Sequence, residues 1–180
     1  EGAPRVLALV EREVTETPKG GVVILADEGQ TANDALIEGL RGRLTEAGWA
    51  TLSLGNDQVS PTLQLARQRL ETRKALPGDE SSQADQPVMI DVNDQAAEAI
   101  LETQREEMNA RLHSAVSWLQ ERDYARVLLV GVGRGALAIN DYLPEAPEVV
   151  TGLAWIAPDF GTRAPGELAS GLEEVTVRLL

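Results

Sequence analysis

Short apolar runs separated by turn-forming residues mark the first strands of the chain. Residues 6–10 and 22–26 are aliphatic or β-branched, and Thr-Pro-Lys-Gly-Gly at 17–21 separates them, which predicts two strands joined as an edge hairpin. Residues 31–48 predict a helix that ends at Gly48, with Leu36, Leu40 and Leu44 on one face. Residues 49–54 predict the next strand. A strand, a helix and a strand with such short joints predict a βαβ unit with parallel strands.

The remaining pattern predicts further helices and strands. Ser60 as N-cap and Pro61 as first helical residue predict a helix that ends before Pro77. Residues 94–122 predict a long helix with one apolar stripe, formed by Ala97, Leu101, Met108, Leu112, Val116 and Leu119. The pattern then predicts a central strand at 127–130, a helix at 136–142, and strands at 149–156 and 175–180.

This order of elements predicts an α/β fold, a three-layer α/β/α sandwich with a mostly parallel sheet. A chain of 180 residues that is 43% hydrophobic suffices for a single domain, expected to span residues 1–180. Within it, the polar residues 77–87 predict an exposed acidic loop.

Charge and composition exclude several classes of function. A net charge of -13 opposes binding to nucleic acids and anionic membranes, because both need Lys and Arg. The chain has no cysteine and one histidine, so no metal site and no cofactor are expected. Its apolar runs are too short for a membrane span, which predicts a soluble protein.

The segment after residues 127–130 carries the one motif that points to chemistry. Gly131, Gly133 and Gly135 have the spacing of G-x-S-x-G, the nucleophile elbow of α/β-hydrolases, between a predicted strand and a predicted helix. Gly133 stands where the nucleophile should be, and a glycine has no side chain to attack a substrate.

Three stretches of the chain resemble a known family. They are GVVILADEG at 21–29, residues 40–54 with the core GWATLSL, and LLVGVGRGA at 128–136. They resemble the uncharacterised bacterial α/β-hydrolase-like proteins grouped as domain of unknown function 3530. The resemblance implies an α/β-hydrolase-like sheet, incomplete at the C-terminal side of this sequence, so that the natural chain would extend beyond residue 180. It also implies an exported, periplasmic protein without established activity, although a cytoplasmic location stays open.

The other parts of a hydrolase site are only partly present. In this fold the acid and the histidine follow the nucleophile in the chain, whereas His113 precedes the elbow. Asp159, after the next strand, could stand at the position of the acid. The oxyanion hole would use the N–H of Arg134 and one near Glu28 or Gly29.

Two carboxylates lie at the expected oxyanion hole. Asp27 and Glu28 would oppose developing negative charge unless Arg134 pairs with them, and that pairing is left open. A second reading takes Gly131, Gly133 and Ala136 as a dinucleotide fingerprint with Asp159 as the ribose-binding acid. However, that fingerprint normally follows the first strand of its sheet.

The favoured hypothesis is a degenerate α/β-hydrolase-fold protein, a pseudoenzyme that serves as a binding or structural module. Its partner would be a small molecule or a protein. The alternatives are an esterase-like acyl hydrolase with an unorthodox site and a dinucleotide-binding module. The edge strand expected at 175–180 would allow self-association.

Overall fold

A computed structural model describes residues 7–75, 92–161, 163 and 178–179 of the protein. The described strands are β1 (Ala8–Glu11), β2 (Gly20–Glu28), β3 (Trp49–Asn56), β4 (Val127–Val132), β5 (Val150–Ile156) and β6 (Arg178–Leu179). The helices are α1 (Ala35–Glu46), α2 (Pro61–Ala75), α3 (Val92–Gln120), α4 (Gly135–Tyr142) and the 3-10 turn η1 (Leu143–Glu145). The expected order of strands and helices is confirmed within these residues.

The strands form one sheet in the order β1-β3-β2-β4-β5-β6. β1 pairs antiparallel with β3, and all other neighbours are parallel. The predicted hairpin of the first two strands is therefore wrong, because β3 lies between them. The run Val22 to Ala26 is buried on both faces, which requires a central place in the sheet, whereas β1 is partly exposed and occupies the edge.

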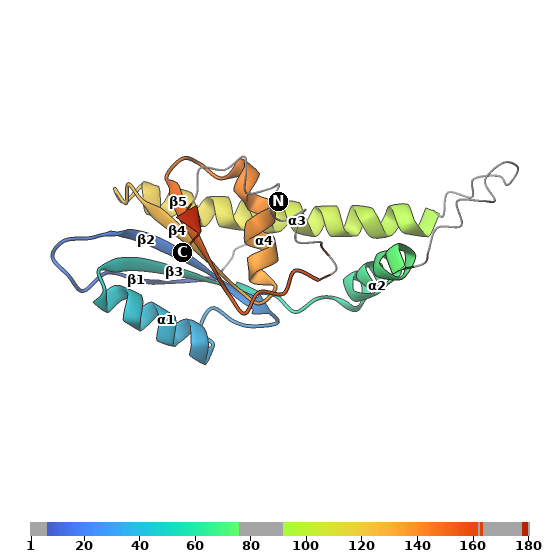
Figure 1. The fold of residues 1–180 in the computed structure, drawn as a ribbon, viewed down its shortest axis with the longest axis horizontal. Coiled ribbons are helices and arrows are strands. Elements are labelled where there is room, and N and C mark those ends of the chain that lie inside the picture. Colours follow the sequence, from blue (N-terminus) through green and yellow to red (C-terminus); the bar gives the residue numbers. More distant parts are fainter. Residues whose placement is uncertain (1–6, 76–91, 162, 164–177, 180) are drawn as a thin grey trace, which may run out of the picture. The chain divides into compact units, whose positions relative to one another are not determined.

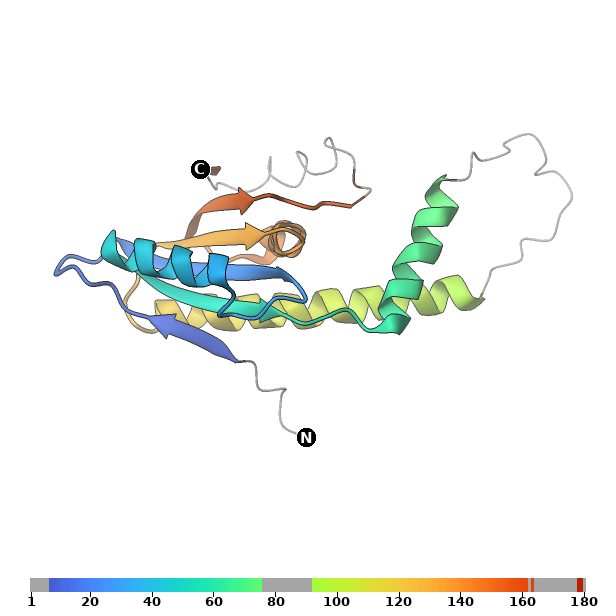
Figure 2. The same ribbon diagram turned by 90° about the horizontal axis from the view of Figure 1, so that it is seen from below.

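Helices cover both faces of the sheet (Figures 1 and 2). One face packs against α1 through a cluster around Val22, Ile24 and Ile37. The other face packs against the last turns of α3 and against α4 through a larger cluster around Leu112, Leu129 and Ile139. This confirms the three-layer sandwich.

The buried face of α1 differs from the predicted one. Leu36 is 47% exposed, while the buried residues of the helix are Ile37, Arg41 and Thr45. Leu40 and Leu44 pack only at the margin of the core cluster. The three leucines share a helix face, but the helix lies on the sheet through the face one residue further along.

The chain divides into two compact units, Glu1–Gln58 with Met108–Leu180, and Val59–Glu107. In the second unit Ser60 caps α2, since its Oγ accepts the N–H of Leu63 at 3.2 Å. The predicted cap and the first helical position of Pro61 are thus confirmed. The predicted stripe of α3 is buried at Ala97 in this unit, and at its positions from Met108 onward in the first unit.

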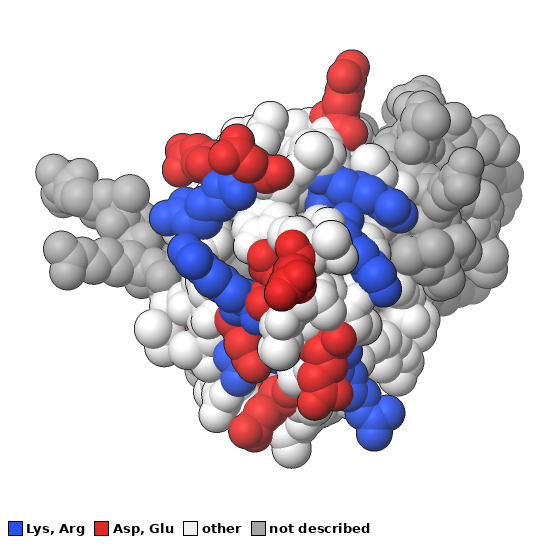
Figure 3. Space-filling view, turned by 90° about the vertical axis from the view of Figure 1, so that its left-hand side faces the viewer, with Lys and Arg blue, Asp and Glu red and all other residues white. Residues whose placement is uncertain are grey.

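Several expectations fall on residues outside the described part. These are the acidic loop at 77–87, a helix before β6, and most of the strand expected at 175–180, of which β6 is described. No described helix is long and apolar enough to cross a membrane. On the face that Figure 3 presents, acidic and basic side chains alternate, so the net charge does not gather there in one patch.

Replacing Leu112 by Ala tests the packing of α3 on the sheet. Leu112 is fully buried, so Leu112→Ala should lower the free energy of unfolding by about 2–5 kcal/mol. The matched control Leu36→Ala, at a half-exposed position, should change it by less than about 1 kcal/mol. Chemical denaturation measures both, and equal losses would contradict the assigned face of each helix.

Candidate functional site

The predicted elbow is present at the carboxyl end of the central strand β4. β4 ends at Val132, Gly133 and Arg134 make the turn, and α4 begins at Gly135. Gly133 has φ +54°, in the left-handed region where a side chain is strained. Its N–H donates to the carbonyl of Ile156 on β5 at 3.0 Å. The strand, sharp turn and helix required by the motif are thus confirmed.

The outer glycines of the elbow are required by close backbone contacts. A Cβ on Gly131 would lie 2.5 Å from Cα of Ala136, and one on Gly135 would lie 2.6 Å from the carbonyl oxygen of Ala26. Both contacts are with main-chain atoms, which cannot rotate away. These glycines let α4 pack tightly against β4 and β2.

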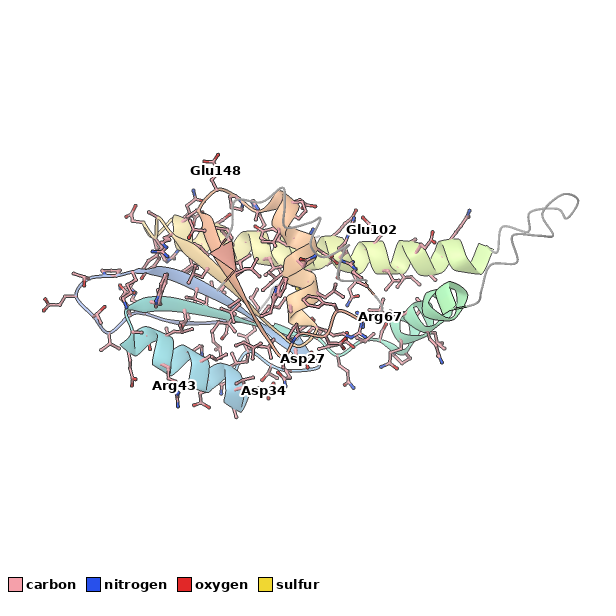
Figure 4. The ribbon with its side chains drawn as sticks, viewed as in Figure 1. Asp27, Asp34, Arg43, Arg67, Glu102 and Glu148 are labelled. Atoms are coloured by element: carbon pink, nitrogen blue, oxygen red, sulfur yellow. The ribbon has the colours of Figure 1, made fainter. Side chains whose placement is uncertain are left out.

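The central glycine is crowded by a side chain instead. A Cβ on Gly133 would lie 2.2 Å from Cγ of Asp27, 2.3 Å from its Oδ1 and 2.4 Å from its Oδ2. Asp27 stands near the end of β2, beside the first turn of α4 (Figure 4). Its carboxylate therefore fills the space in which the nucleophile of a hydrolase would begin.

The same carboxylate accepts the backbone donors expected to form the oxyanion hole. Asp27 Oδ1 accepts the N–H of Arg134 at 2.8 Å and the N–H of Glu28 at 2.7 Å. A substrate oxyanion would need two such donors at about 2.7–3.1 Å. The start of α4 also favours a negative charge at this place. Asp27 Oδ1 therefore accepts the two N–H groups that the sequence suggested for an oxyanion hole.

The other predicted site residues surround this contact. Of the two N–H groups suggested beside Arg134, that of Glu28 donates to Asp27 at 2.7 Å, whereas that of Gly29 donates to the carbonyl of Asn56 at 2.9 Å. The sequence left open whether Arg134 pairs with Asp27 or Glu28. The backbone N–H of Arg134 donates to Asp27, while its guanidinium Nε pairs with Asp159 Oδ2 at 3.0 Å.

Asp159 fastens the loop after β5 to the elbow. Its N–H donates to the carbonyl of Gly133 at 3.0 Å, and its Oδ1 accepts the N–H of Gly161 at 2.9 Å. The sequence suggested Asp159 for the position of the acid, and its carboxylate is engaged with Arg134 and its own loop. Gly161 had no signal in the sequence beyond a glycine in a loop.

The only histidine of the chain, His113, lies on α3. It contacts the last residue of α4, whereas the elbow lies at the start of that helix. His113 is exposed, and its Nδ1 lies 3.4 Å from the hydroxyl of Tyr142 at the far end of α4. Burial raises the pKa of Tyr142 to about 12, so this hydroxyl stays neutral at ordinary pH. His113 therefore pairs with a structural tyrosine rather than with the elbow.

Among the described residues, no group of three His, Asp or Glu side chains is arranged to hold a metal ion.

The dinucleotide hypothesis needs the start of α4 to receive a pyrophosphate. There the N–H of Arg134 already donates to Asp27. The other residues of the fingerprint also have contacts within the protein. Gly131 packs against the backbone of Ala136, and the carboxylate of Asp159 binds Arg134.

Asn56 was missed by the sequence reasoning. It ends β3, is 7% exposed, and its Nδ2 donates to the carbonyl of Ala26 at 3.4 Å. Its backbone also exchanges hydrogen bonds with Gly29 and Gln30. Asn56 thus holds the loop that carries Asp27 and Glu28, and only its place at a strand end could have indicated this.

Replacing Asp27 by Ala tests the carboxylate in the hole. Asp27→Ala leaves two backbone donors without their acceptor and should lower the free energy of unfolding by about 1–3 kcal/mol, measured by denaturation. Asp27→Asn, which keeps an accepting oxygen, should lose less. The control Asp159→Ala removes a half-exposed ion pair and should cost below about 1 kcal/mol. An Asp27→Ala variant with the same free energy of unfolding as the wild type would show that the contact does not hold the elbow.

Solved structures share this fold. A dienelactone hydrolase-like promiscuous phosphotriesterase from metagenomic libraries superposes on the protein with a TM-score of 0.58 and 14% sequence identity. The match covers 99% of this chain and 76% of the phosphotriesterase chain. The dienelactone hydrolase of Anabaena variabilis gives TM-score 0.57 and 18% identity, covering 96% of this chain and 64% of its own. A putative dienelactone hydrolase of Klebsiella pneumoniae gives 0.55 and 14%, with coverages of 96% and 64%.

At these identities the likeness shows the fold alone. The chain spans 64% of the length of each of these two dienelactone hydrolases, less than two thirds. No curated protein sequence matches the chain. The resemblance seen in the sequence is confirmed over residues 1–180, which match the family described as protein of unknown function DUF3530. The chain belongs to the DUF3530 family and has an α/β-hydrolase-like fold.

Proposed function

We propose that this chain is a pseudoenzyme, an α/β-hydrolase-fold module that binds a partner or supports a structure without catalysing hydrolysis. The observation that carries the proposal is the position of Asp27. Its carboxylate fills the space of a nucleophile at Gly133 and accepts both N–H groups of the oxyanion hole.

Electrostatics argue against acyl transfer at this place. A tetrahedral intermediate gains its stabilisation from the donors of the hole, and a fixed carboxylate there both removes those donors and repels the developing charge. Asp159 does not supply a substitute nucleophile in this geometry, since its carboxylate is paired with Arg134.

Activity measurements test the proposal directly. The purified protein should neither react with a fluorophosphonate probe, followed by mass spectrometry, nor hydrolyse p-nitrophenyl acetate above the rate of the buffer. Gly133→Ser should also stay inactive, because the new Cβ would collide with the Asp27 carboxylate and His113 lies on another helix.

The outcome that overturns the proposal is turnover that depends on this site. An esterase with an unorthodox arrangement would show hydrolysis that survives purification and is lost in Asp27→Asn or Asp159→Asn. A surface variant such as Glu38→Gln, on the exposed side of α1, is the matched control and should leave any contaminating activity unchanged.

We further propose that the protein works outside the cytoplasm, in the periplasm. Its support is the resemblance of the sequence to exported members of the family. Fractionation of cells that express the natural gene with a C-terminal tag should place the tag in the periplasmic fraction. Recovery of the protein with cytoplasmic markers would contradict this location.

A further inference from the structure

The sheet ends on one side at β1. This strand pairs antiparallel with β3, and no strand in the described part of the chain pairs with its other side. Figure 2 shows β1, the dark blue strand, at the margin of the sheet. An unpaired edge presents backbone N–H and C=O groups that can bind a strand of another chain. The sequence suggested self-association at residues 175–180, but at that opposite edge only the two residues of β6 are described.

β1 carries apolar side chains and no feature that would protect its edge. Val10 is 42% exposed although its partner Leu52 is buried, and Leu7, just before the strand, is 77% exposed. Proteins commonly protect an edge strand from pairing with lysine, proline or a bulge. β1 has none of these, since it reads Ala-Leu-Val-Glu and pairs with β3 without a register shift. Its one charge, Glu11, stands at its end.

We propose that β1 pairs antiparallel with β1 of a second copy of this chain, across a two-fold axis at Leu9. An axis perpendicular to the sheet keeps the α1 layers of both copies on the same side of the joined sheet. Side chains of opposed residues must then point to the same face, so the axis passes beside a residue and not between two. Leu9 faces Leu9 of the second copy, and Ala8 faces its Val10.

The side chains select Leu9 rather than its neighbours as the residue on the axis. With Leu9 there, the opposed pairs between residues 8 and 10 are all apolar, and Glu11 faces Leu7. An axis at Val10 would set Glu11 against Leu9 twice, and an axis at Glu11 would set two carboxylates against each other. Like charges that face each other directly destabilise a strand pair. An axis at Ala8 would leave Val10 and Glu11 outside the paired strands.

The size of this edge sets the strength of the dimer. Four residues per strand bury less than the roughly 800 Å² per partner of a standard interface, so the dimer should be weak and reversible. Each copy carries a net charge of -13, and the resulting repulsion is screened by salt, with a Debye length of about 10 Å at 0.1 M. Added salt should therefore strengthen this dimer, whereas it would weaken an interface made of ion pairs.

The interface goes beyond the proposed function and does not depend on it. In the order of the sheet, β3 and β2 separate β1 from β4, which carries the elbow. A dimer through β1 neither requires nor excludes hydrolysis at the elbow, so the two proposals can fail separately.

Sedimentation equilibrium tests the interface. The wild type should pass from monomer to dimer between about 10 μM and about 1 mM protein, the range of a weak complex. Val10→Lys places a charge on each side of the axis and should raise the dissociation constant about tenfold or more, because an ammonium group in the paired edge opposes association. A wild type that stays monomeric at the highest concentration would overturn the proposal.

Val14→Lys is the matched control. Val14 is also an exposed valine, but it lies beyond the strand, where its N–H donates to the carbonyl of Thr45 at 3.1 Å. The two substitutions change the net charge equally, so they alter the overall repulsion between copies to the same extent. Val14→Lys should keep the dissociation constant of the wild type. Equal weakening by both substitutions would overturn the proposal.

Cross-linking keeps the test decisive if Val10→Lys does not fold. The chain has no cysteine, so a single introduced thiol can react only with its counterpart in another copy. Directly opposed residues have Cβ atoms about 4.5–5.5 Å apart, close to the spacing in a disulfide. Air oxidation of Leu9→Cys should therefore give a linked dimer on a non-reducing gel, and Val14→Cys much less. Equal yields from the two variants would overturn the register and the proposal with it.

Discussion

The carboxylate of Asp27 is the contact on which the elbow region depends. It joins the end of β2 to the first turn of α4, because one oxygen accepts the N–H of Glu28 and the N–H of Arg134. These two residues are distant in sequence and lie on different strand ends. Without this acceptor, one backbone donor at the end of β2 and one at the start of α4 would need another partner. The carboxylate thus satisfies the two donors that the sequence suggested for an oxyanion hole.

The glycines of the elbow have different physical origins. Gly131 and Gly135 are bounded by main-chain atoms, so any member of this fold with the same packing needs them small. Gly133 is bounded by the Asp27 side chain and has a positive φ. The pattern of three glycines therefore combines a requirement of the backbone packing with a requirement set by the Asp27 side chain.

Local signals in the sequence sufficed for most of the fold. The apolar runs of β2 and β4 and the Ser60-Pro61 helix start identify elements through contacts close in sequence. The pairing of β1 with β3 was mistaken, since neighbouring runs look alike whether they form a hairpin or are separated by a third strand. The inner face of α1 was also mistaken, because leucines at regular spacing outweighed a buried arginine in the pattern.

The candidate site was predictable as a list of residues but not as an arrangement. Asp27, Glu28 and Arg134 were identified from their places at strand and helix ends. That Asp27 accepts the two N–H groups could not be read from the sequence, because it depends on the distance between two loops. The pairing of Arg134 with Asp159 depends likewise on how the β5 loop folds over the elbow.

The mutual exclusion of a side chain at 133 and the carboxylate at 27 fixes the order in which substitutions could change this elbow. Introducing a serine first would create an overlap at 2.2 Å in a backbone that already disfavours side chains. Shortening residue 27 first would instead leave the donors open to solvent and the turn free to accept a side chain. A side chain at position 133 therefore depends on a change at position 27.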